Sequence, residues 1–161
     1  MNVLVIDNDV MIALIEFLYK ANKDSFSRVI NYLKLNYGEI WIPGTVYCEF
    51  CLKREDPKKK TLLDKIMSKY NLLVKCPYKV NKSEIRIIVG QAEDNHGEAD
   101  AILQIKKATS CDRIKGRIIL ERIAFISNDS GAITQAKKYG IDTYPYSELR
   151  NKMNEAGVIL P

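Results

Sequence analysis

The first seven residues restrict the fold most. Residues 3–6, Val-Leu-Val-Ile, form an uninterrupted apolar run, and Asp7 follows directly. Such a run is typical of a strand buried on both faces, as in a parallel sheet. Further short apolar strands are expected at residues 39–42, 72–74, 124–126 and 142–144, with amphipathic helices between them. We therefore predict an α/β fold, a three-layer α/β/α sandwich with a mainly parallel central sheet.

Capping residues predict where the helices begin. One helix is expected directly after residues 7–9 and another after residues 127–129, the latter ending at Gly140. The other expected caps are Asp24-Ser25, Thr45, Asp56 before Pro57, Asn81 with Glu84, Asn95 with Glu98, and Ser147. Residues 109–122 fit a helix, a hairpin or a basic loop, and the sequence leaves these alternatives open.

Composition sets the class of protein. The chain has 161 residues with 47% hydrophobic and 28% charged residues, which predicts one globular domain over residues 1–161. The best apolar run, residues 10–18, contains Glu16 and is too short to span a membrane. Asp7 interrupts the first apolar run, so a secretion signal is not expected. The four scattered cysteines indicate a reduced, cytoplasmic protein.

Four carboxylates are candidates for one common site. Asp7 and Asp129 follow predicted strands, Glu49 lies one turn into a helix, and Asp100 lies in the first turns of another. Ligands of parallel α/β sheets bind at the carboxyl ends of the strands. Carboxylates gathered there repel each other unless a cation lies among them. Hard oxygen ligands without thiolate or imidazole indicate Mg2+ or Mn2+ rather than zinc.

A purely structural role is the alternative for several acidic residues. Asp9, Glu84 and Glu98 stand at helix starts, where a carboxylate satisfies free N–H groups and the helix dipole. Asp7 is harder to explain in this way, because desolvating a carboxylate directly after four buried apolar residues is costly. The residues alone do not show that the four candidates meet in space.

The order of four motifs resembles that of a PIN domain. PIN domains are small metal-dependent ribonuclease domains found among bacterial and archaeal toxins and in RNA-processing factors. The resemblance covers residue 3 to about residue 145, and its most specific part is the Gly-Glu-Ala-Asp-Ala-Ile stretch, common in one PIN subgroup. The motifs are Val-Leu-Val-Ile-Asp7-Asn-Asp9, Pro-Gly-Thr-Val-Tyr-Cys-Glu49-Phe, Gly97-Glu98-Ala-Asp100-Ala-Ile and Phe-Ile-Ser127-Asn-Asp129.

The resemblance implies a metal-dependent ribonuclease. The catalytic, metal-binding carboxylates would be Asp7, Glu49, Asp100 and Asp129, with Asp9 and Glu98 as supporting ligands. Ser127 matches a hydroxyl residue that relatives often place two positions before the last acid. One or two Mg2+ or Mn2+ ions would activate water for phosphodiester hydrolysis, leaving a 5′-phosphate and a 3′-hydroxyl. The chain between the third and fourth acids is longer than in compact relatives and is rich in basic residues.

Partners are expected from the same resemblance and from charge. RNA is the expected substrate, and the net charge of 25 − 20 = +5 agrees weakly with a polyanionic partner. Lysine and arginine at 53–54, 58–60 and 113–122 are candidate phosphate contacts, although a solvated helix face is the more common explanation of such runs. An antitoxin protein and a second copy of the chain are further candidate partners.

Two cysteines and the single histidine have ordinary explanations. Cys48-x-x-Cys51 lies on a predicted helix without a second pair, so buried apolar thiols are favoured over a zinc or redox site. His96 is expected to lie exposed near a helix start.

Two other functions remain open. Strand-Asp7-x-Asp9 also resembles the nucleophile and acid of haloacid-dehalogenase phosphatases, with residues 128–141 resembling their last motif. Against this, Ile133 stands where that motif carries its second acid, and Glu49 is left without a role. The third hypothesis is a PIN-like RNA-binding module without activity, although all four acids are present.

Overall fold

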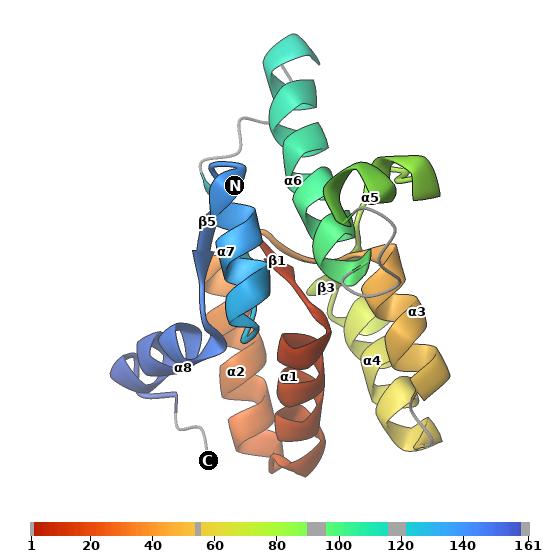
Figure 1. The fold of residues 1–161 in the computed structure, drawn as a ribbon. Coiled ribbons are helices and arrows are strands. Elements are labelled where there is room, and N and C mark those ends of the chain that lie inside the picture. The colour runs from red at the N-terminus through yellow and green to blue at the C-terminus, as the bar shows by residue number, and fades with distance from the viewer. Residues whose placement is uncertain (1, 54–55, 90–95, 116–121, 159–161) are drawn as a thin grey trace.

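The computed structural model describes residues 2–53, 56–89, 96–115 and 122–158. Figure 1 shows helices packed around a central group of strands. In chain order the elements are β1 (Asn2–Ile6), α1 (Asn8–Lys20), α2 (Lys23–Asn36), β2 (Glu39–Ile42), α3 (Gly44–Lys53), α4 (Pro57–Lys69), β3 (Leu73–Lys75), α5 (Lys82–Val89), α6 (His96–Lys115), β4 (Arg122–Ile126), α7 (Ser130–Lys138), β5 (Asp142–Tyr144) and α8 (Tyr146–Glu155).

The five strands form one sheet in the order β3-β2-β1-β4-β5, and every pair is parallel. β1 lies at the centre, where Val5 is in register with Trp41 of β2 and Phe125 of β4. The predicted α/β fold is therefore confirmed. β2 and β5 have the predicted bounds, β1 and β4 begin earlier, and β3 is shifted by one residue.

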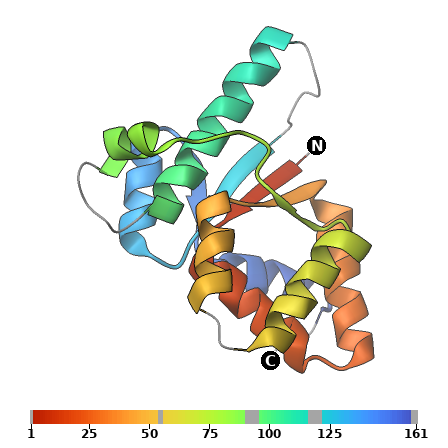
Figure 2. The same cartoon turned by 90° about the vertical axis from the view of Figure 1, so that its right-hand side faces the viewer.

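Side chains of the central strands alternate between two apolar layers, as a pleated strand buried on both faces requires. Leu4 and Ile6 pack into a cluster with residues of α1, α2, α4 and α8. Val3 and Val5 point to the other face and pack with residues of α6 and α7. Figure 2 shows α6 and the α1–α2 pair on opposite sides of the strands. These layers account for the α/β/α arrangement.

Several predicted helix caps are confirmed and others are wrong. Asp56 accepts a hydrogen bond from the Lys58 N–H at 2.9 Å with Pro57 at the first helical position. Gly140, expected to stop α7, has a φ of 71°, the left-handed conformation that glycine favours. α2, however, is capped by Asn22 rather than by Asp24-Ser25. α8 begins after Pro145 rather than at Ser147, without a side-chain cap.

Residues 109–122, whose conformation the sequence did not determine, are partly helical. α6 continues to Lys115, which extends the helix past residue 109, whereas residues 116–121 lie outside the described chain. Among the helices that the structure describes, none is both long and apolar enough to cross a membrane.

Candidate functional site

The candidate site lies where the order of the strands reverses. From β1 the chain moves to β2 and β3 on one side of the sheet, and it later returns to β4 and β5 on the other. The carboxyl ends of β1 and β4 are therefore neighbours, with Asp7 directly after β1 and the 127–129 turn directly after β4. Such a switch point leaves a crevice that binds ligands in many open α/β sheets.

A pocket of about 150 Å3 opens at this crevice. Five carboxylates from four segments of the chain share its wall, and no Lys, Arg or His of the described chain lines it. The described lining residues are Asp7, Asn8, Asp9, Val46, Glu49, Gly97, Glu98, Asp129 and Ala132. We call this hollow the acidic pocket. Its lining includes five of the six acidic residues that the sequence analysis proposed as metal ligands.

Ser127 connects the carboxylate after β1 to the turn after β4. Its hydroxyl donates a hydrogen bond to Oδ2 of Asp7 and accepts one from the Asp129 N–H at 3.0 Å. Ser127 is fully buried, so water does not compete for these bonds. The hydroxyl thus fixes the position of Asp7 relative to the backbone of Asp129.

Asp7 and Asp129 each begin a helix as well. Oδ1 of Asp7 accepts the Asp9 N–H at 3.0 Å, and Oδ1 of Asp129 accepts the Gly131 N–H at 2.7 Å. These bonds satisfy free donors at the first turns of α1 and α7. One oxygen of each carboxylate is therefore held by the helix that it caps, which directs both side chains at the acidic pocket.

Close packing of α3 against α6 brings Glu49 and Glu98 to the same pocket. A Cβ added at Gly97 would lie 2.9 Å from Cγ2 of Val46, which is closer than real Cβ contacts. Val46 and Phe50 are buried on the core-facing side of α3 and anchor that helix. The missing side chain at Gly97 therefore lets the two helices approach, and their acidic residues meet across the pocket.

Two carboxyl groups of the acidic pocket, those of Asp7 and Glu98, have raised pKa values. Burial raises the pKa of Asp7, and the negative charge of Asp9 adds to this rise, while the Ser127 hydrogen bond opposes it. Burial also raises the pKa of Glu98, with further contributions from the charges of Asp129 and Asp7. The pocket thus disfavours full ionisation unless a positive charge enters it.

Asp100 is the one acidic candidate that is not among the described residues lining the acidic pocket. Asp100 is 4% exposed, and its Oδ2 accepts hydrogen bonds from the backbone N–H of Thr45 at 3.1 Å and from its hydroxyl at 2.8 Å. Its Oδ1 accepts a bond from Gln104 at 3.2 Å. Both oxygens are engaged, so Asp100 connects α6 to the start of α3.

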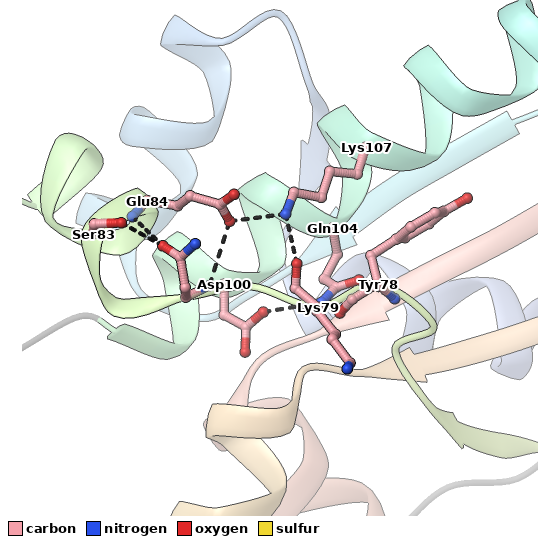
Figure 3. A network of polar contacts seen from close by, with 8 residues as sticks. Tyr78, Lys79, Ser83, Glu84, Asp100, Gln104 and Lys107 are labelled. Atoms are coloured by element: carbon pink, nitrogen blue, oxygen red, sulfur yellow. Dashed lines mark hydrogen bonds and ion pairs between the residues drawn. The ribbon is translucent and has the colours of Figure 1, made fainter.

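Gln104 extends this connection to the chain between β3 and α5. Its amide exchanges two hydrogen bonds with the backbone of Tyr78, at 3.1 and 2.7 Å. Lys107, one turn further along α6, pairs with Glu84 of α5 at 2.8 Å (Figure 3). Asn81 and Glu84 form the predicted capping box, so Glu84 serves α5 and takes no part in the acidic pocket.

The donor set of the acidic pocket fits a hard divalent cation. Carboxylates and an amide are oxygen ligands of the kind that Mg2+ and Mn2+ bind. The Asn8 side-chain oxygen is buried without a hydrogen-bond partner in the described structure, so an acceptor at the pocket is unused. No three Asp, Glu, His or Cys side chains of the described chain are already grouped tightly enough to hold a metal.

Several lysine and arginine residues were proposed as phosphate contacts. Most of those whose side chains the structure describes form ion pairs with carboxylates instead. Lys59 lies 3.2 Å from Glu16, and Lys60 lies 3.0 Å from Asp64. Arg122 lies 3.8 Å from Asp142. Arg54 and residues 116–121 lie outside the described chain, and the side chains of Lys53 and residues 113–115 are not described either.

The predictions for the thiols and the histidine are partly wrong. Cys48 is exposed and Cys51 is half-buried, because Val46 and Phe50 occupy the core-facing positions of α3. His96 is half-buried at the start of α6 rather than exposed. Asn8 was missed as a pocket residue, although its position between Asp7 and Asp9 was a usable signal.

No family model matches the chain, and no curated protein matches it.

Proposed function

We propose that this protein is a Mg2+- or Mn2+-dependent ribonuclease that hydrolyses phosphodiester bonds in RNA at the acidic pocket. One observation carries the proposal: five carboxylates from four segments of the chain line one pocket, and no cationic side chain of the described chain lies among them. A phosphodiester is itself anionic, so it would approach this pocket only with a divalent cation present. The motif order of a PIN domain supports the same chemistry.

The geometry suggests one change in the set of ligands. Asp7, Glu49, Glu98 and Asp129 would hold the metal, with Asp9 and Asn8 at its margin. Glu98 takes the place that the resemblance assigns to Asp100, because Glu98 lines the acidic pocket and Asp100 is not among its described lining residues. When bound, the metal would supply an activated water and offset the charge that builds on the phosphate.

The side chains themselves have three tasks in this reaction. Ser127 holds Oδ2 of Asp7, so the carboxylate keeps one orientation when the substrate arrives. Glu98 would supply an oxygen ligand from the start of α6, opposite the ligands that follow the strands. Val46 and Ala132 form the apolar part of the wall and limit the water that reaches the phosphate. Hydrolysis then breaks the bond to the 3′ oxygen, as the resemblance implies.

The phosphatase alternative explains less of the site. It uses Asp7 and Asp9 but gives no role to Glu49 or Glu98, and both line the same pocket. RNA is the partner that the nuclease requires, whereas an antitoxin and a second copy of the chain stay predictions.

Cleavage of a labelled RNA with Mn2+, Mg2+ or a chelator tests the proposal. We expect cleavage only with metal, and a loss of about 100-fold or more in Asp7→Asn and Glu49→Gln, the upper end of the cost of disturbing a metal's surroundings. The matched control is Asp24→Asn, which removes an exposed carboxylate that pairs with Arg28 on α2. Hydrolysis of a small phosphomonoester without RNA cleavage would support the phosphatase, and RNA binding without cleavage would support an inactive module.

A further inference from the structure

A second hollow, of about 270 Å3, adjoins the acidic pocket. Glu98, Asp129 and Ala132 line both hollows, so the two share a wall. The far side of the second hollow is formed by the end of α5 and by α7, through Ile88, Val89 and Gln135. We call it the side hollow. A substrate bound at the acidic pocket could extend into it without leaving the surface.

The side hollow differs chemically from the acidic pocket. Ile88 and Val89 are half-buried and present an apolar wall. No Lys, Arg or His of the described chain lines the side hollow, and two carboxylates stand at its shared edge. A phosphate there would be repelled on one side and desolvated on the other. The hollow therefore suits an uncharged and partly apolar group.

Gln135 supplies the polar group of this hollow. Its side chain is half-buried and makes no hydrogen bond to any other residue that the structure describes. An amide presents a donor and an acceptor side by side, and this pair complements the edge of adenine that carries N6 and N7. Unstacked bases of single-stranded RNA are recognised by such edge contacts together with apolar contacts to the ring.

We propose that the side hollow receives the base of the nucleotide next to the cleaved phosphodiester, and that Gln135 selects adenine there. The inference rests on the proposed nuclease function and names the part of the substrate that the neighbouring hollow binds. Ile88 and Val89 would contact the ring, and the ribose-phosphate chain would lead from it to the acidic pocket.

Oligouridine strands that carry one adenosine, one guanosine, one cytidine or one abasic position test the selection. With Mn2+, we expect cleavage beside the adenosine with kcat/KM about tenfold above the cytidine strand, the size of one good amide–base contact. Gln135→Leu should remove this preference and leave Mn2+ affinity unchanged. The control is Thr134→Val, since the Thr134 hydroxyl bonds to the Ser130 carbonyl within α7 and lies outside the hollow.

Binding separates this inference from the nuclease proposal. Fluorescence anisotropy with Glu49→Gln, which should not cleave, compares the adenosine strand with the abasic strand. We expect about tenfold tighter binding of the adenosine strand and loss of this difference when Gln135→Leu is added. Equal binding of the two strands overturns the base site, even if the wild-type protein cleaves RNA. A Gln135-dependent preference in a protein that cleaves no RNA supports the base site and overturns the nuclease.

Discussion

Asp7 and Asp129 serve the fold and the acidic pocket at the same time. Each uses Oδ1 to accept N–H groups at the start of its own helix. Asp7 keeps its other oxygen for the Ser127 hydroxyl, which lies between the two turns. The capping role and the proposed metal-binding role are therefore not alternatives, because a helix start at the end of a parallel strand directs the capping carboxylate at the crevice.

At the residue scale, the pH dependence of Glu98 can be predicted. Burial and the charges of Asp129 and Asp7 raise its pKa in the folded state. The folded protein then binds the proton more strongly than the unfolded chain, so the free energy of unfolding falls as pH rises from about 4 through the raised pKa. Without metal, the Tm of Glu98→Gln should therefore increase relative to that of the wild type as pH rises through this range. With added Mn2+, the wild type should have the higher Tm, because it keeps the Glu98 ligand.

A pH series of thermal melts with and without Mn2+ measures this effect. Glu148→Gln is the control, since Glu148 is exposed on α8 and lies outside the acidic pocket. A constant Tm difference between Glu98→Gln and the wild type at every pH would contradict the electrostatic explanation.

The Gly-Glu-Ala-Asp stretch shows what sequence can and cannot resolve at a single residue. Glu98 and Asp100 are two positions apart on α6, and residues with this spacing point to different sides of a helix. Only one of them can face a given pocket. The motif locates the helix beside the site, but the rotation of the helix depends on Gln104 and Thr45, which are distant in sequence from one another.

At the scale of elements, Asp100 should control stability more than metal binding. Asp100→Ala removes the acceptor of two hydrogen bonds from Thr45 and one from Gln104, all at a buried site. We expect the free energy of unfolding to fall by about 3 kcal/mol, as for loss of several bonds to a charged group. Denaturant unfolding measures this loss, and Mn2+ titration calorimetry measures the affinity of the folded variant.

The conservative substitution distinguishes the two roles of Asp100. Asp100→Asn keeps one acceptor oxygen for Thr45, so it should bind Mn2+ better than Glu98→Gln does. Loss of Mn2+ binding in Asp100→Asn, with binding intact in Glu98→Gln, would restore Asp100 as a ligand and contradict the role proposed for it.

The contact of α3 with α6 at Gly97 is a second test at this scale. Gly97→Ala places a methyl group 2.9 Å from Cγ2 of buried Val46, so one helix must move. Overpacking of this kind costs about 1–3 kcal/mol. The double variant Gly97→Ala, Val46→Ala gives the methyl group room, so it should cleave better than Gly97→Ala and about as well as Val46→Ala alone. Additive losses in the double-mutant cycle would show that the contact does not position the pocket.

The sequence predicted strands well where burial on both faces alone determines the residues that form them. Residues 3–6 and 124–126 are apolar strands because both faces of the sheet are covered by helices. Caps were less predictable, since several polar residues near a helix start compete for the same N–H groups. Asn22 therefore caps α2 in place of Asp24-Ser25, a difference of two residues.

At the scale of the whole molecule, the strand order creates the site. Placing β1 between β2 and β4 gathers the ends of β1 and β4 and the start of α3 at one edge of the sheet. Sequence could predict that acidic residues follow strands, but it could not predict which strands are neighbours. The side hollow was not predictable for the same reason, because α5, α6 and α7 meet only after the sheet is complete.

The most direct test of the central claim is a crystal structure of the protein soaked in Mn2+, with anomalous diffraction to locate the ion. We predict an anomalous peak in the acidic pocket, bound by Asp7 together with Glu49, Glu98 or Asp129. The peak should vanish in Asp7→Asn. An occupied Mn2+ site elsewhere on the protein with an empty acidic pocket, or no bound Mn2+ in a well-ordered crystal, would contradict the account.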